Sequence, residues 1–326
     1  MNELRFWLVR HRGTLIAAAI FIAMFVLYTS RHPAGFSASV VQTAANKGVL
    51  LAFVAMAQSL VVITSGIDLS VGMILILTNC LASWVAFGSP LETAAGVLLV
   101  LLTGLLCGAI NGLIVIYGRL QPIVATIATG AIYFGIALAL RPQPGGQVNS
   151  DLADVLTGRV FGIFPTSLVA LAVVVLIVWV PFRRSLTGRA AYATGSSETA
   201  AYMSGLPIGR AKIVAYALAG LLSAVGGLFL TFFTYTGDAA YASGNIYTLY
   251  SIAAVVLGGV SLFGGSGSAI GAIFGAFAFR TIGDLLFVFD FDPLWQPLFQ
   301  GLVLMVAVCI SAIGLLQVRN RLEWFG

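Results

Sequence analysis

The feature that most limits what this chain can fold into is a succession of apolar runs of bilayer length. A transmembrane helix needs about 20 consecutive, mostly apolar residues, and such runs recur through most of the 326 residues. The third and eighth runs are short enough to be broken or re-entrant. The ten runs are residues 14–30, 48–65, 71–87, 93–117, 120–140, 162–182, 211–236, 249–263, 267–289 and 293–316. The sequence therefore predicts an all-α integral membrane protein with about ten transmembrane helices, in the range of eight to ten.

Composition argues against a soluble enzyme domain beside these helices. Hydrophobic residues make up 60% of the chain and charged residues 8%, whereas soluble domains carry about a quarter charged residues. The two histidines, His11 and His32, flank the first run far from any acidic cluster. No nucleophile–base spacing and no metal-ligand spacing is visible. We predict that residues 1–326 form a single transmembrane domain that is not an enzyme and binds neither a metal nor a cofactor.

The distribution of Lys and Arg predicts the orientation. With ten spans, the side that holds both chain ends receives Arg5, Arg10, Arg12, Arg119, Arg183, Arg184, Arg189, Arg210, Lys212, Arg319 and Arg321, and the other side receives Arg31, Lys47, Arg141 and Arg159. The positive side is cytoplasmic, so both termini are predicted to be cytoplasmic and the first run to be a signal anchor. The net charge of +5 reflects this topology, because the basic residues form no aromatic-rich patch of the kind that binds nucleic acid.

One sizeable polar segment interrupts the apolar sequence on the predicted cytoplasmic side. Residues 188–205 read GRAAYATGSSETAAYMSG, between Arg183-Arg184 and an apolar run that begins near Ile213. A soluble partner would hold a membrane domain at a segment of this kind. We therefore place a partner-binding segment at about residues 183–212.

Polar residues also lie within or between the runs, where each needs a partner or a water-filled path. Thr64 to Gly72 is a short turn with two glycines and a carboxylate. Its Asp68 and Ser70 are typical of a helix N-cap, and two interpretations remain: a capping turn, or a bend beside a transport path. A similar pattern ends at Gly264-Gly265, and many transporters consist of two related halves whose broken helices frame the path.

Amides and one charge pair complete the candidates inside the membrane. The amides are Gln58, Asn79, Asn111 and Gln121. Each either binds a sugar hydroxyl or clamps two helices together. Arg280 and Asp284 lie four residues apart in the ninth run, and this spacing predicts an ion pair on one helix face.

Three motifs resemble those of one transporter family. Residues 66–72, GIDLSVG, look like an element of bacterial ABC importer permeases of the ribose/xylose/galactofuranose type. Val255-Val256-Leu257-Gly258-Gly259 through Ser261-Leu262-Phe263-Gly264-Gly265 resembles another shared element. The polar segment resembles the cytoplasmic loop of the family at Gly188, Tyr192, Ala193, Gly195, Ala200, Ala201, Ser204 and Gly205, and departs from it at Ser197, Tyr202 and Leu206. The likeness extends from about residue 45 to about residue 316.

The resemblance implies a function for these residues. The loop would form a coupling helix that docks on a separate ATPase subunit, through Tyr192, Gly195, Glu198, Ala200, Ala201, Ser204 and Gly205. The translocation path or its broken-helix turns would include Gln58, Gly66, Asp68, Ser70, Gly72, Asn79, Asn111, Gly264 and Gly265. Further partners would be a periplasmic substrate-binding protein and a second permease copy or a paralogue, in the bacterial inner membrane.

The energy source follows partly from the residues themselves. A phosphate-binding loop reads G-x-x-x-x-G-K-[ST], and neither Lys47 nor Lys212 occurs in that context. ATP and Mg²⁺ would therefore be bound by the partner ATPase. The resemblance indicates a monosaccharide as the cargo, although relatives of this fold also carry branched-chain amino acids and nucleosides.

Two other function classes remain open at this point. A secondary carrier driven by protons or sodium would need an ionisable residue in mid-membrane, for which Asp284 is the candidate. A multispan scaffold without transport agrees with the composition alone.

Overall fold

The computed structural model describes residues 2–239, 241–306 and 308–309, and most of them are helical. The first half contains α1 (Asn2–Arg31), α2 (Ala38–Ile63), α3 (Val71–Val85), α4 (Pro90–Tyr117), α5 (Pro122–Leu140) and α6 (Ser150–Thr157), followed by the short hairpin β1 (Arg159–Val160) and β2 (Phe164–Pro165). The second half contains α7 (Thr166–Val174), the π-helical turn η1 (Val175–Trp179), α8 (Val180–Arg184), α9 (Leu186–Ser196), α10 (Glu198–Met203), α11 (Ile208–Thr234), α12 (Tyr241–Leu257), α13 (Ala269–Val288) and η2 (Pro293–Trp295).

Each of the ten predicted apolar runs overlaps a helix in the described part of the chain. Within the described residues, seven helices are long and apolar enough to cross a membrane, and three apolar helices are shorter: Val71–Val85, Gly244–Leu257 and Pro293–Val306. The predicted shortness of the third and eighth runs is therefore confirmed. The end of the tenth run, Arg319 and Arg321 lie outside the described residues. The number of membrane crossings and the side of each terminus stay predictions.

The sixth run is helical only from Thr166, because its first residues belong to the β1–β2 hairpin, and the helix contains a local change of winding. The π-helical turn η1 joins α7 to α8, and Pro181 is the second residue after it. Because proline lacks an amide hydrogen, it removes one donor from the regular i→i−4 ladder. A single wider turn within an α-helix is the usual form of such a π-bulge.

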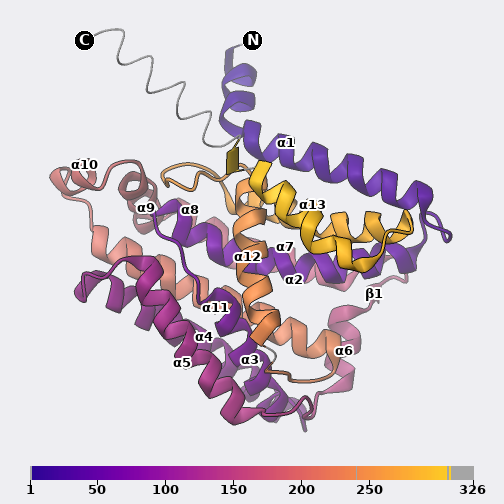
Figure 1. Ribbon diagram of the computed structural model, residues 1–326. Helices are drawn as coiled ribbons and strands as arrows, with labels where there is room; N and C mark the ends of the chain where they lie inside the picture. Colours follow the sequence, from indigo (N-terminus) through magenta and orange to yellow (C-terminus); the bar gives the residue numbers. More distant parts are fainter. Residues whose placement is uncertain (1, 240, 307, 310–326) are drawn as a thin grey trace.

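Helix α2 lies at the centre of the molecule. Its most apolar stretch is 94% buried, whereas the corresponding stretch of α1 is 17% buried. Helices α11, α12 and α13 all pack on α2, and Figure 1 shows α1 beside α13 at the periphery. The exposed leucines and isoleucines of α1, α4 and α5 suit contact with lipid. The polar side chains of α2 and α3 lie inside the molecule, where other helices enclose them.

Small residues allow a close helix approach between α4 and α11. A Cβ atom added to Gly108 would overlap the carbonyl oxygen of Tyr216, and one added to Gly220 would overlap that of Gly104. Membrane helices associate through such small residues because their backbones can then come into contact. Gly220 therefore serves helix packing.

Candidate functional site

The polar segment folds into two short helices, each begun by a serine. Ser185 Oγ accepts a hydrogen bond from the Gly188 amide at 3.0 Å, which caps α9. Ser197 Oγ accepts from the Ala200 amide at 3.3 Å, which caps α10. Serine is a favoured N-cap because its hydroxyl satisfies an amide that has no partner within the helix. The change of direction between the two helices is thus encoded at Ser197, where the sequence departs from the family loop.

Helix α10 is also fixed at its far end and to its neighbour. The Gly205 amide donates to Tyr202 O and the Leu206 amide to Ala201 O, a Schellman arrangement that needs a left-handed residue. Gly205 supplies it with a φ of +71°. In addition, Lys212 Nζ lies 2.8 Å from Glu198 Oε2, which joins α10 to the first turns of α11.

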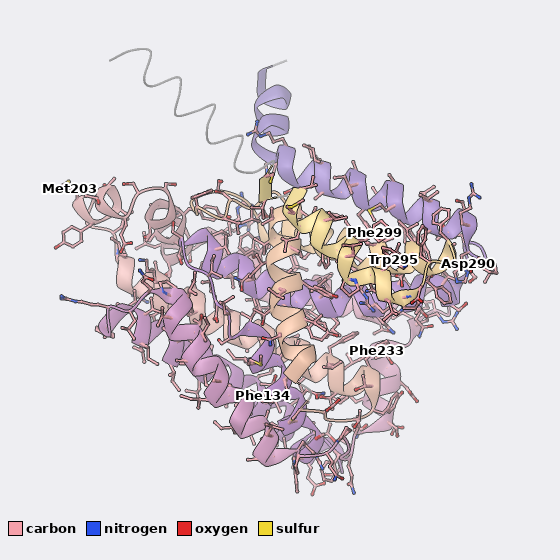
Figure 2. The ribbon with its side chains drawn as sticks, viewed as in Figure 1. Phe134, Met203, Phe233, Asp290, Trp295 and Phe299 are labelled. Carbon is pink, nitrogen blue, oxygen red and sulfur yellow. The ribbon has the colours of Figure 1, made fainter. Side chains whose placement is uncertain are left out.

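This arrangement presents an apolar tip to the outside. Met203 is 83% exposed and Tyr202 76% exposed, and Figures 1 and 2 show α10 and the labelled Met203 at the edge of the molecule. Of the predicted coupling residues, Glu198, Ala200, Ser204 and Gly205 are exposed, whereas Gly195 and Ala201 are buried and Tyr192 is half-buried. Sequence reasoning missed Met203 and treated Tyr202 only as a departure, although exposed apolar residues in a polar loop were the available signal.

The three motifs identified in the sequence meet at one place. Ser65 Oγ lies 3.0 Å from the Gly195 carbonyl oxygen and 2.7 Å from that of Phe263. The Gly265 amide donates to Ile63 O at 3.0 Å. We name Ser65, Gly195, Ser196, Gly264 and Gly265 the junction. It joins the end of α2 to the end of α9 and to the loop between α12 and α13.

The junction has no spare volume. A Cβ on Gly195 would overlap backbone atoms of Ile63 and Gly265, and one on Gly265 would overlap Ser196. Gly264 and Gly265 have positive φ angles of +87° and +70°. Ser65 also has a positive φ, of +62°, which is unusual for a residue with a side chain. Its two hydroxyl contacts explain why a serine is tolerated there.

Beyond the junction, the turn that follows α2 contains a buried carboxylate. Asp68 is fully buried, and its Oδ1 accepts from the Ser70 amide at 2.8 Å and from Ser70 Oγ at 2.6 Å. The predicted capping contact is thus made by the Asp68 side chain, since Ser70 itself makes no side-chain cap bond. Burial raises the pKa of the Asp68 carboxyl in this turn, whereas the bonds from Ser70 and Asn111 oppose that shift.

Hydrogen bonds extend from Asp68 into α4 and α5. Asn111 Nδ2 donates to Ser70 Oγ at 2.7 Å, and Tyr133 OH donates to Asn111 Oδ1 at 3.0 Å. We name Asp68, Ser70, Asn111 and Tyr133 the interior network. Two buried polar atoms here lack hydrogen-bond partners within the described chain: Oδ2 of Asp68 itself and the Tyr216 hydroxyl. Sequence reasoning missed both tyrosines, because a tyrosine in an apolar run looks like an interface residue.

The two glycines of this turn make close contacts on either side of the network. A Cβ on Gly66 would lie 2.8 Å from the Tyr216 hydroxyl, and one on Gly72 would overlap the Gly244 carbonyl oxygen. The Gly72 amide donates to Thr248 Oγ1 at 3.1 Å. Both glycines therefore let α11 and α12 approach the turn.

The remaining predicted amides differ from one another. Asn79 donates to Thr231 Oγ1 at 2.8 Å and accepts from the Asp238 amide at 2.9 Å, so it clamps α3 to the segment at the end of α11. Gln58 is fully buried in α2, and neither of its amide atoms has a hydrogen-bond partner among the described residues. Because buried amides are normally paired, Gln58 is a candidate for contact with water or a solute.

The predicted ion pair between Arg280 and Asp284 is wrong. Asp284 Oδ1 instead lies 3.1 Å from Lys47 Nζ of α2. The tertiary approach of α13 to α2 places a cation from another helix nearer to this carboxylate than its neighbour four residues earlier. No cluster of three or more His, Cys, Asp or Glu side chains that could hold a metal ion occurs in the described part of the chain.

Comparison with known proteins identifies the family. The family model described as the permease component of the branched-chain amino acid transport system matches residues 40–308. The chain belongs to this permease family. It is therefore a transport subunit and a multi-pass protein of the inner membrane, and the predicted identity as a permease rather than an enzyme is confirmed.

Several curated permeases are similar over most of their length. The ribose import permease protein of Haemophilus influenzae is 34% identical over 303 residues, which cover 90% of this chain and 92% of that protein. The fructose import permease protein of Rhizobium meliloti is 31% identical, covering 85% of this chain and 78% of that protein. The autoinducer 2 import system permease protein of Enterobacter sp. is 32% identical, with coverages of 95% and 87%. No solved structure matches the chain.

Proposed function

We propose that this permease is the membrane-spanning subunit of an ATP-binding cassette importer that carries a monosaccharide. The observation that carries the proposal is the similarity to ribose and fructose import permeases over 90% and 85% of the chain. In this proposal a periplasmic binding protein delivers the sugar, and a separate ATPase binds ATP and Mg²⁺. A second permease copy or a paralogue completes the path.

The topology that we propose has ten helices crossing or entering the membrane and both termini in the cytoplasm. The contact between Gly13 and Gly259 supports the side of the N-terminus, since a Cβ on Gly13 would lie 3.0 Å from Gly259 Cα. The loop that contains Gly259 continues to the junction beside α9. The first part of α1 and the polar segment therefore lie on the same side, which is the side richer in Lys and Arg.

Helix α10 is the proposed docking element for the ATPase. Its backbone is fixed by the Ser197 cap and the Gly205 turn, while Tyr202 and Met203 extend into the solvent. A rigid helix with an apolar tip suits insertion into a groove of a soluble partner. Gly195 and Ala201 would act indirectly, by positioning α10 against the rest of the permease.

The interior network is the proposed response element at the translocation path. The turn between α2 and α3 is surrounded by Gly66, Asp68, Gly72 and Asn111. Gln58 lies in α2, before this turn. Because Ser65 binds the end of α9, a displacement of α9 by the ATPase would move this turn. Asn79 we assign to holding α3 rather than to contact with sugar, since its amide is already paired.

The proposal is tested with a charge placed on the exposed tip. Met203→Asp should abolish co-purification of the ATPase and ATP-driven uptake of labelled ribose or fructose into proteoliposomes. Phe161→Asp is the matched control, because Phe161 is 95% exposed in the β1–β2 turn and receives the same change on the side predicted to be periplasmic. Both variants should insert into the membrane normally, since neither side chain is buried.

Two results would contradict the proposal. If the Met203→Asp permease binds the ATPase and imports sugar as the unmodified protein does, α10 is not the docking element. The second result would come from proteoliposomes that contain the permease, the ATPase and the binding protein. If ATP drives uptake of another solute but of neither ribose nor fructose, the sugar assignment is wrong while the importer assignment stands.

A further inference from the structure

A charged cavity lies between α1, α2, α13 and the helix that begins at Pro293. Its volume is about 360 Å³, and ligand pockets typically have volumes of about 300–1,000 Å³. The polar side chains that line it are Tyr28, His32, Thr43, Lys47, Arg280, Asp284 and Gln296. Figure 2 shows Trp295, the neighbour of Gln296, beside α13 at this end of the molecule. The cavity lies on the opposite side of the molecule from α10, as the labelled Trp295 and Met203 show in Figure 2.

The charges in this cavity do not balance. Lys47 and Asp284 form an ion pair at 3.1 Å, with side chains that are 32% and 13% exposed. Arg280 also lines the cavity and is half-buried, but it makes no ion pair or hydrogen bond within the described part of the chain. One positive charge therefore remains without a counter-charge.

An uncompensated guanidinium in an apolar protein favours an anionic ligand. Charged groups at membrane depth are costly unless they are paired or reach water. The planar guanidinium binds phosphate oxygens through two parallel hydrogen bonds, which an ammonium group does not do. Tyr28, Thr43 and Gln296 add donors of hydrogen bonds to the same cavity. A neutral sugar would satisfy the donors but would leave the charge uncompensated.

The surroundings of the cavity include surfaces of the kind that faces lipid. The most apolar stretch of α1 is 17% buried, and both phenylalanines that line the cavity, Phe287 and Phe291, are exposed, by 71% and 48%. Basic pockets between transmembrane helices on the cytoplasmic side of other membrane proteins bind lipid head groups, and the contact between guanidinium and phosphate is the same on either side of the membrane. The site therefore combines a cation, neutral donors and apolar side chains at its edge.

We propose that this cavity is a phosphate-binding site centred on Arg280 and separate from the transport path. The phosphate belongs either to the head group of an anionic phospholipid or to a free phosphate ion, and the guanidinium contact is the same in both cases. The Lys47–Asp284 pair sets the affinity, because the carboxylate repels the incoming anion while the ammonium group attracts it. The inference goes beyond sugar import and does not depend on it.

The test measures binding to the full chain, purified in detergent and stripped of lipid. Short-chain phosphatidylglycerol, short-chain phosphatidylcholine, inorganic phosphate and ribose are titrated separately, and dissociation constants are measured. The expected result is saturable binding of phosphatidylglycerol or of phosphate, with weak binding of phosphatidylcholine and of ribose. Saturation by phosphate alone at a comparable concentration identifies the free ion as the ligand. Binding of phosphatidylglycerol without phosphate identifies the lipid.

Two variants with opposite expected effects keep the proposal falsifiable. Arg280→Gln should weaken binding by about tenfold or more, because a charge-assisted bidentate contact is lost. Asp284→Asn should strengthen it, since the repelling carboxylate is removed while an amide can still bond Lys47. Arg159→Gln is the control, because Arg159 is an exposed cation of the β1–β2 hairpin. Equal binding by the Arg280→Gln and unmodified proteins, or equal loss in the control, would overturn the proposal, as would binding of ribose alone.

Discussion

Two glycines of the polar segment should respond differently to the same substitution. Gly195 has a negative φ, but a Cβ there would lie well under 3.0 Å from backbone atoms of Ile63 and Gly265. Gly205 has a φ of +71° but no atom within 4 Å of an added Cβ. Gly195→Ala should therefore destabilise the protein through steric overlap at the junction. Gly205→Ala should destabilise it through an unfavourable backbone conformation at the surface.

The magnitudes follow from these two causes. Overpacking costs about 1–3 kcal/mol, and Gly195→Ala should reach the upper end because backbone atoms cannot rotate away. A left-handed residue with a Cβ costs about 1 kcal/mol, which applies to Gly205→Ala. The difference of about 2 kcal/mol corresponds to about a 30-fold change in the ratio of folded to unfolded protein.

The assay combines stability with coupling. Thermal unfolding midpoints in detergent should fall more for Gly195→Ala than for Gly205→Ala. In proteoliposomes with the ATPase, Gly195→Ala should also lose more sugar uptake than ATP hydrolysis, because α9 is displaced from α2. If both alanine variants unfold at the same temperature and transport equally well, the close contact between α9 and the end of α2 does not exist in the protein.

Two further predictions concern the turn after α2. Ser70→Ala should lower stability by about 2–4 kcal/mol, because Asp68 loses a charge-assisted bond and the Asn111 amide is left unpaired. Thermal unfolding measures this loss. Ser30→Ala is the control, because the Ser30 hydroxyl is exposed and bonds only within its own helix. Ser65→Gly relieves the left-handed strain and should leave the unfolding midpoint almost unchanged, but it removes both hydroxyl contacts of the junction, so uptake per ATP hydrolysed should fall. Unchanged uptake per ATP would refute a coupling role for Ser65.

The sequence predicted the helices well because their signal is local. A run of about 20 apolar residues is recognisable without any tertiary information, and the breaks at Ser65–Ser70 and after Leu257 follow glycines and polar residues that mark turns. The polar segment at about residues 183–212 was also predictable from local sequence, because its polar residues interrupt the apolar runs. Its division into α9 and α10 follows from the caps at Ser185 and Ser197, which are also local.

The contacts between distant residues were not predictable in this way. Helical spacing favoured an Arg280–Asp284 pair, but a cation on α2 occupies that position instead. Asn79 and Gln58 look alike in the sequence, and only the packing of α11 shows that Asn79 is paired while Gln58 has no partner among the described residues. Hydrogen-bond partners separated by many residues depend on which helix faces enclose α2 and α3, and a single sequence does not contain that information.

The short connection from Ser65 to Ser70 has a mechanical consequence. Ser65 binds the end of α9 at one side of this turn, and Ser70 binds Asp68 and Asn111 at the other. Because α2 is almost wholly buried, it cannot move far without repacking α11, α12 and α13. A displacement of α9 is therefore more easily absorbed by the turn and by α3, the shorter helix. Packed interiors change between discrete arrangements rather than deforming continuously. We expect a second arrangement to pair the oxygens of Asp68 and Tyr216 that have no hydrogen-bond partner among the described residues.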